Sequence, residues 1–92
     1  MTRKLPYLDL YTGDWHKDPS LSLCEPATRG IWIDLICAMH DRDRCGVITG
    51  TAEQLARLGR CSAVEIVQAL SDLQTQQAAD VTQRGDRWTV IN

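Results

Sequence analysis

The clearest pattern of apolar and polar positions lies in residues 63–77, "AVEIVQALSDLQTQQ". Apolar side chains recur there at the spacing of one helix face. They are Ile66, Val67, Leu70 and Leu73. Polar residues occupy the opposite face: Glu65, Gln68, Asp72 and Gln76. Ser62 precedes the run and is a favoured N-cap residue, so we expect an amphipathic helix that begins after Ser62.

A second helix is predicted over residues 25–43, because Pro26 follows Glu25 and proline is favoured at the first helical position. Its segment "IWIDLICAM" is apolar on nearly every side except around Asp34. A helix that is apolar all round is packed by several neighbours. We therefore expect this helix at the centre of the fold.

Two shorter elements lie between these helices. The segment "CGVITG", residues 45–50, favours a strand bracketed by glycines. The segment "TAEQLARLG", residues 51–59, favours a short helix that Thr51 caps and Gly59 ends. Its inward-facing side chains are Leu55 and Leu58.

The C-terminal segment "ADVTQRGDRWTV", residues 79–90, predicts a β-hairpin with "RGDR" as its turn. The inward-facing side chains are Val81, Trp88 and Val90. An R-G-D tripeptide also occurs in adhesion motifs, but glycine followed by aspartate is common turn chemistry.

Residues 1–24 favour an irregular arm with at most one short strand, anchored to the body by aromatic side chains. The anchors recur every four residues: Tyr7, Tyr11 and Trp15. Pro6 and Gly13 argue against one continuous helix. The following "GDWHKDPS" is dense in turn residues, so we expect His16 to be exposed and without a chemical role.

The predicted order is helix, strand, short helix, tight turn, helix, strand, strand, which is the chain order of a winged helix. The expected fold is therefore α+β, a winged helix-turn-helix with three helices, a short strand and a C-terminal β-hairpin wing. Ninety-two residues have room for one modest core, so we expect a single domain over 1–92, with 1–24 packed on it as the arm.

Composition and charge narrow the function. The chain is 43% hydrophobic and 24% charged, as folded domains are, and its net charge of −2 gives no long-range attraction for polyanions. Any contact with DNA would have to be a local patch. The N-terminal "MTRKLPYLDLY" lacks the apolar run of a signal peptide, and no apolar stretch approaches membrane-spanning length. We therefore expect a cytoplasmic location.

The sequence gives little support for a metal site. The cysteines include no C-x-x-C pair, so free thiols are favoured over a scattered zinc site that would include His16 and His40. These cysteines are Cys24, Cys37, Cys45 and Cys61. Residues 41–52 begin like a calcium loop but carry Cys45 and Ala52 where oxygen ligands are needed.

No enzyme signature is present either. A Cys37–His40 pair would lie on a helix face that we expect to be buried, with no third residue to orient it. The chain has no glycine-rich phosphate loop and no nucleophile elbow. We expect no catalytic activity, no cofactor and no small-molecule substrate.

Three segments carry a family resemblance. They are the arm "PYLDLYTGDWHKDPSL", the first helix "PATRGIWIDLICAMHD" and the helix-turn-helix entry "QLARLGRCS". Together they resemble the N-terminal domain of phage and prophage replication proteins of the initiator or replisome-organizer type, which have winged-helix folds. Members of that family often continue with basic residues and a linker, whereas this chain ends at Asn92, which leaves open whether it is a stand-alone unit or a fragment of a longer protein. The third helix is also unusually acidic for the family.

The resemblance implies duplex DNA as a partner, because a winged helix places its third helix in the major groove and its wing on phosphates. The groove-facing residues would be Ser62, Ala63, Glu65, Gln68 and Asp72. The phosphate contacts would come from Arg57, Arg60, Arg84 and Arg87, with Arg3 and Lys4 of the arm as possible additions. About four such contacts predict weak, salt-sensitive binding on the order of micromolar or poorer.

A protein-interaction or dimerisation module without DNA contact remains open, since the fold does not fix the function. Arg57 or Arg60 would then pair with Glu53 or Glu65 as ordinary surface charges. A glutamine-rich face would supply the contact with a replication protein or a second copy of the chain. Its residues are Gln74, Gln76 and Gln77.

Overall fold

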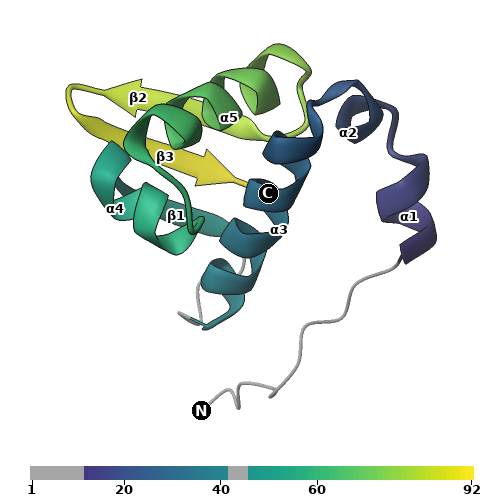
Figure 1. Cartoon of the computed structure of the whole chain (residues 1–92), viewed down its shortest axis with the longest axis horizontal. Coiled ribbons are helices and arrows are strands. Elements are labelled where there is room, and N and C mark those ends of the chain that lie inside the picture. The colour runs from purple at the N-terminus through teal and green to yellow at the C-terminus, as the bar shows by residue number, and fades with distance from the viewer. Residues whose placement is uncertain (1–11, 42–45) are drawn as a thin grey trace.

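A computed structural model of the chain describes residues 12–41 and 46–92. These residues form five helices and a three-stranded antiparallel sheet (Figure 1). In chain order the elements are α1 (Thr12–Lys17), α2 (Pro19–Leu23), α3 (Pro26–Asp41), β1 (Val47–Thr51), α4 (Ala52–Leu58), α5 (Ala63–Thr75), β2 (Asp80–Arg84) and β3 (Arg87–Ile91). The predicted α+β class is confirmed.

The central helix α3 begins at Pro26, as the sequence predicts. Its buried side chains come from several sides of the helix: Thr28, Ile31, Trp32, Leu35, Ile36 and Met39. Helices α4 and α5 and strand β1 all contact α3, and α1 and α2 lie beyond it (Figure 1). The expectation of a helix with neighbours on several sides is confirmed.

Helix α5 begins after Ser62, which forms a capping box with Glu65. The Ser62 hydroxyl accepts the Glu65 N–H at 3.1 Å, and the Glu65 carboxylate accepts the Ser62 N–H at 2.9 Å. The buried stripe is Ile66, Ala69, Leu70 and Leu73. Val67, expected in that stripe, is 39% exposed, so this prediction was wrong. Its position one residue after Ile66 turns it about 100° away from the core.

Helix α4 is capped by Thr51, whose hydroxyl accepts the Gln54 N–H at 3.3 Å. Leu55 is fully buried and Leu58 is half-buried, as expected. Gly59 ends the helix with a right-handed φ of −82°, and the left-handed residue is Arg60, with φ of 56°.

The sheet has the strand order β1-β3-β2, with every pair antiparallel. A two-residue loop joins β2 to β3, and Gly85 in it has φ of 62°, the positive angle that the first central position of a type II′ turn needs. Val81 and Val90 face each other in register and are buried, while Trp88 is half-buried. The predicted hairpin is confirmed.

The N-terminal arm is a correction. Residues 12–23 contain two short helices, so the chain has five helices in its described part where three were expected. Asp18 caps α2, because its carboxylate accepts the N–H groups of Ser20 and Leu21. Turn formers and helix caps are the same residue types, which is why this segment favoured an irregular structure.

The anchors of that arm are only partly described. Trp15 is half-buried and packs against the core, and His16 is exposed as expected. Tyr7 and Tyr11 lie outside the described residues, as do Arg3 and Lys4. Residues 42–45, the middle of the calcium-like loop, lie outside them as well.

The three described cysteines are free thiols: Cys24, Cys37 and Cys61. Cys24 is buried, and its burial and the nearby Asp72 raise the pKa of its thiol. Cys37 is exposed, so the expectation that it lies on a buried helix face was wrong.

No helix in the described part of the chain is long and apolar enough to cross a membrane.

Candidate nucleic-acid interface

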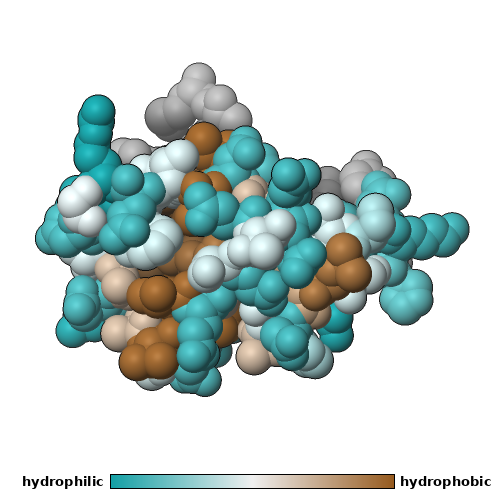
Figure 2. Space-filling view, turned by 90° about the horizontal axis from the view of Figure 1, so that it is seen from above, coloured by the Kyte–Doolittle hydropathy of each residue, from teal (hydrophilic) through white to brown (hydrophobic). Residues whose placement is uncertain are grey.

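The face of α5 that points away from the core carries no charge. We call it the α5 ridge, and its residues are Val64, Val67, Gln68, Ser71 and Thr75, all exposed. Val64 is the most prominent, with 67% of its surface exposed. Figure 2, which views the molecule from the α5 side, shows hydrophobic atoms at the surface among hydrophilic ones. The ridge can offer methyl, amide and hydroxyl groups to a ligand.

Only Gln68 of the ridge was among the candidates from sequence. Val64, Val67, Ser71 and Thr75 were missed because Val67 was assigned to the core. The small residue Ala69 belongs to the buried stripe, beside Ile66 and Leu73. With Ala69 in the stripe in place of Val67, the helical spacing puts the ridge residues on the exposed face.

Ser62 and Glu65 occupy the first turn of α5, where each binds the backbone of the other. The Ser62 N–H, followed by the Ser62 hydroxyl, lowers the pKa of the Glu65 carboxyl. Glu65 is therefore an ionised helix cap, and part of its capacity to accept a hydrogen bond from a base is already used.

Arg84 and Arg87 lie directly opposite each other at the end of the hairpin. Side chains alternate between the two faces of a strand, and Val90 and Val81 point into the core, so Arg84 and Arg87 both point to the outer face. Cross-strand neighbours have Cβ atoms about 4.5–5.5 Å apart, and like charges placed so are destabilising. No ion pair joins either arginine to a carboxylate of residues 12–41 or 46–92. We call these two residues the hairpin tip.

Arg57 and Arg60 lie elsewhere. They line a hollow of about 280 Å³ between α3 and the end of α4, together with Asp34 and Asp41. Thr51, which pairs with Arg87, caps the opposite end of α4, so α4 separates this pair from the hairpin tip. The four arginines expected to support DNA binding thus form two pairs. Arg57 and Arg60 share a hollow with two carboxylates, whereas the nearest carboxylate to the hairpin tip in sequence is the exposed Asp86 of its loop, which forms no ion pair with either arginine within the described residues.

The expected surface pairs of these arginines are not formed. Within the described residues, neither Arg57 nor Arg60 is joined by an ion pair to Glu53 or Glu65.

A groove of about 350 Å³ follows the flank of α5 that faces α3. Its lining combines apolar and acidic groups: Glu25, Ala27, Thr28, Ile31, Glu65, Gln68, Ala69 and Asp72. Asp72, expected on the solvent face, is half-buried here and accepts the Glu25 N–H at 2.8 Å. Gln68 therefore belongs to the uncharged ridge and also lines an acidic groove, which repels phosphates.

Part of the glutamine-rich face takes part in contacts within the protein itself. The Gln74 side-chain amide donates to the Val81 carbonyl at 3.0 Å and so ties α5 to β2. Gln76 ends α5 and is half-buried, and Gln77 has a left-handed φ of 58°. These contacts leave less of a free polar face than the sequence suggested.

No protein-family model, curated protein or solved structure matches this chain. Among the described residues, no group of three or more histidine, cysteine or acidic side chains is placed to hold a metal ion.

Proposed function

We propose that residues 26–92 form a winged helix that binds duplex DNA, as the resemblance to phage and prophage replication initiators implies. The order α3, β1, α4, α5, β2, β3 and the strand order β1-β3-β2 support this assignment. In that arrangement α5 enters the major groove and the hairpin is the wing. The proposed role is binding, without catalysis or a cofactor.

The observation that carries the proposal is the hairpin tip. Two guanidinium groups lie side by side on an exposed face, and neither forms an ion pair within the described residues. Such a like-charge pair costs the isolated fold on the order of 0.2–1 kcal/mol. A phosphate between them removes that cost, because guanidinium groups bind phosphate through paired hydrogen bonds. A polyanion with regularly spaced phosphates is the ligand that suits this pair best.

The α5 ridge supplies the base contacts in this proposal. Gln68 is of the right type to bind adenine through two hydrogen bonds, and the methyl groups of Val64 can contact the thymine methyl. Ser71 can bond to several bases. With Glu65 engaged in its cap, Gln68 and the ridge are better candidates for base recognition than Glu65.

The test is the affinity for a fluorescently labelled random-sequence duplex, measured by anisotropy at low salt. Replacing both residues of the hairpin tip (R84Q/R87Q) should weaken binding about tenfold or more, since two phosphate contacts are removed. The matched control R57Q/R60Q removes the same amount of positive charge as R84Q/R87Q, but at the hollow that also contains Asp34 and Asp41. It should weaken binding less than about threefold. Equal losses in both variants, or no binding by the wild type, would overturn the proposal.

A second candidate is a protein-docking role for the same helix, favoured by the exposure of Val64 at 67% and of Val67 at 39%. The acidic groove beside α5 would add attraction for a basic partner. A partner complex that persists at high salt and is lost on V64D, in a chain that does not bind duplex DNA, would support this candidate.

A further inference from the structure

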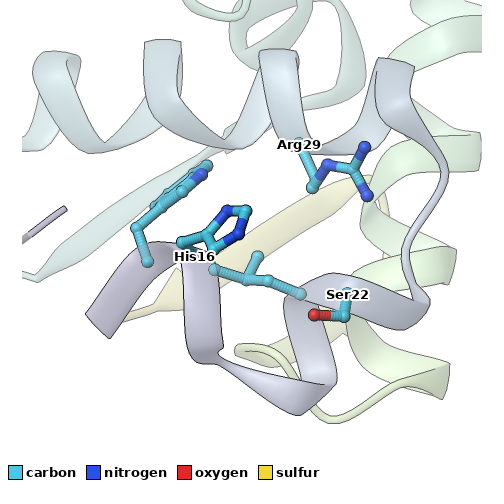
Figure 3. A pocket seen from close by; sticks show the side chains of 5 residues that line it. His16, Ser22 and Arg29 are labelled. Carbon is cyan, nitrogen blue, oxygen red and sulfur yellow. The ribbon is translucent and has the colours of Figure 1, made fainter. Parts of the chain in front are cut away.

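A hollow of about 260 Å³ lies where α1, α2 and α3 meet (Figure 3). Its lining residues come from all three helices: Trp15, His16, Leu21, Ser22 and Arg29. Figure 3 shows the His16 ring, from α1, and the Arg29 side chain, from α3, on two sides of this space, with Ser22 of α2 near its edge. None of these residues belongs to the hairpin tip or to the α5 ridge.

The lining combines flat aromatic groups, an apolar floor and a cation. Leu21 is buried at 5% exposure, and Trp15 is half-buried against the core. None of the lining residues in the described part of the chain is a carboxylate, although the whole chain has a net charge of −2. A ligand that suits this surface has a flat ring system and a negative charge.

The polar groups of the hollow are held in place by the fold. An Arg29 Nη1–H donates to the Cys24 carbonyl at 3.1 Å, which orients the guanidinium and leaves its other N–H groups for an anion. The Ser22 hydroxyl donates to the Asp18 carbonyl at 2.9 Å, so its oxygen is an acceptor for a ligand N–H. Donors and an acceptor thus surround an aromatic and apolar surface.

We propose that this hollow binds one nucleotide unit of single-stranded DNA, with the base against the His16 ring and the phosphate at Arg29. Base stacking on aromatic side chains beside a positive charge is the general mode of single-strand recognition. The volume is just below the range of about 300–1,000 Å³ that is usual for sites of drug-sized ligands, which suits one nucleotide rather than a larger molecule. Figure 1 places α1 and α2 on the far side of α3 from the hairpin tip, so this site is independent of the duplex-binding face.

The experiment uses the full chain and a fluorescein-labelled thymidine decamer, with anisotropy measured at low salt. His16 is exposed, so H16A should preserve the fold and weaken binding about fivefold or more through lost stacking. R29Q should weaken it similarly, and circular dichroism checks that this variant folds. Lys17 is exposed on the same helix but does not line the hollow, so the matched control K17Q should stay within about twofold of the wild type.

Competition with unlabelled thymidine monophosphate tests whether a free nucleotide binds the same site as the strand. Displacement of the labelled decamer by millimolar nucleotide shows that one unit fills the site, and we expect it in the wild type. Decamer affinity that is unchanged in H16A would overturn the proposal, as would a loss in K17Q equal to that in H16A. A loss confined to R84Q/R87Q would assign single-strand binding to the hairpin tip and overturn it too. Failure of the wild type to bind the decamer would also overturn the single-strand proposal, and it would leave the proposal of duplex binding unaffected.

Discussion

At the turn between α4 and α5, the left-handed backbone conformation and the close packing against α3 occur at two different residues, Arg60 and Gly59. The left-handed φ of 56° belongs to Arg60, although this region costs a residue with a Cβ about 1–2 kcal/mol. The glycine is placed one residue earlier, where an added Cβ would lie 3.1 Å from the Ile31 Cγ2 atom. Close packing against α3, rather than backbone conformation, accounts for glycine at position 59.

Replacing Arg60 with glycine should therefore stabilise the fold. The relieved backbone strain exceeds the added chain entropy of glycine, for a net gain of about 0.5 kcal/mol. Thermal unfolding measures the change as a higher Tm. G59A is the companion variant and should lower Tm, because its methyl group meets Ile31. A lower Tm for R60G would contradict this account of the turn.

The Glu65 carboxyl predicts a dependence of stability on pH. Hydrogen bonds from Ser62 lower its pKa below the ordinary value of 4.5, so the folded state favours the ionised form. The resulting stability is complete above pH 4.5 and is lost as the pH falls through the lowered folded-state pKa. Between pH 6 and 3, the Tm of the wild type should fall more than that of E65Q, which keeps a capping group that does not titrate. Parallel curves for the two proteins would contradict the assignment.

At the scale of elements, the side of α5 that faces the core can be tested with two neighbouring residues. Ile66 is fully buried and Val67 is 39% exposed. I66A should cost about 2–5 kcal/mol of unfolding free energy, as loss of a buried aliphatic side chain does, and V67A less than about 0.5–1 kcal/mol. Urea unfolding gives both values. Comparable losses would place Val67 in the core, as its apolar character first suggested.

Element starts were predictable wherever a local cap set them. Pro26, Thr51 and Ser62 each begin a helix at the expected residue, because capping acts through bonds within one turn. Helices α1 and α2 were missed, since Asp18 followed by Pro19 favours a turn as much as a helix start. Whether such a segment continues as a helix depends on what it packs against.

The candidate site was less predictable than the fold. The four arginines were found from sequence, but their separation into two pairs depends on tertiary placement. The pairing of Arg84 with Arg87 depends on a two-residue hairpin loop, and "RGDR" also permits other registers. The hollow that places Asp34 near Arg57 joins α3 to α4, and no local pattern shows that contact.

At the scale of the whole molecule, a net charge of −2 hides an uneven distribution. Carboxylates gather in the groove between α3 and α5 and in the hollow with Arg57 and Arg60. The hairpin tip carries two arginines beside the single carboxylate of Asp86, and the described lining of the hollow between α1 and α3 includes Arg29 and no carboxylate. Net charge is therefore a poor guide to the local charge that a polyanion would meet at each of these surfaces.

The salt dependence of duplex affinity tests the central proposal most directly. The slope of log K against log salt counts phosphate contacts at about 0.9 per contact. For R84Q/R87Q we predict a slope about 1.8 smaller in magnitude than that of the wild type, with R57Q/R60Q close to the wild type. A slope that R84Q/R87Q leaves unchanged would show that the hairpin tip does not contact phosphates, and would contradict the proposed function.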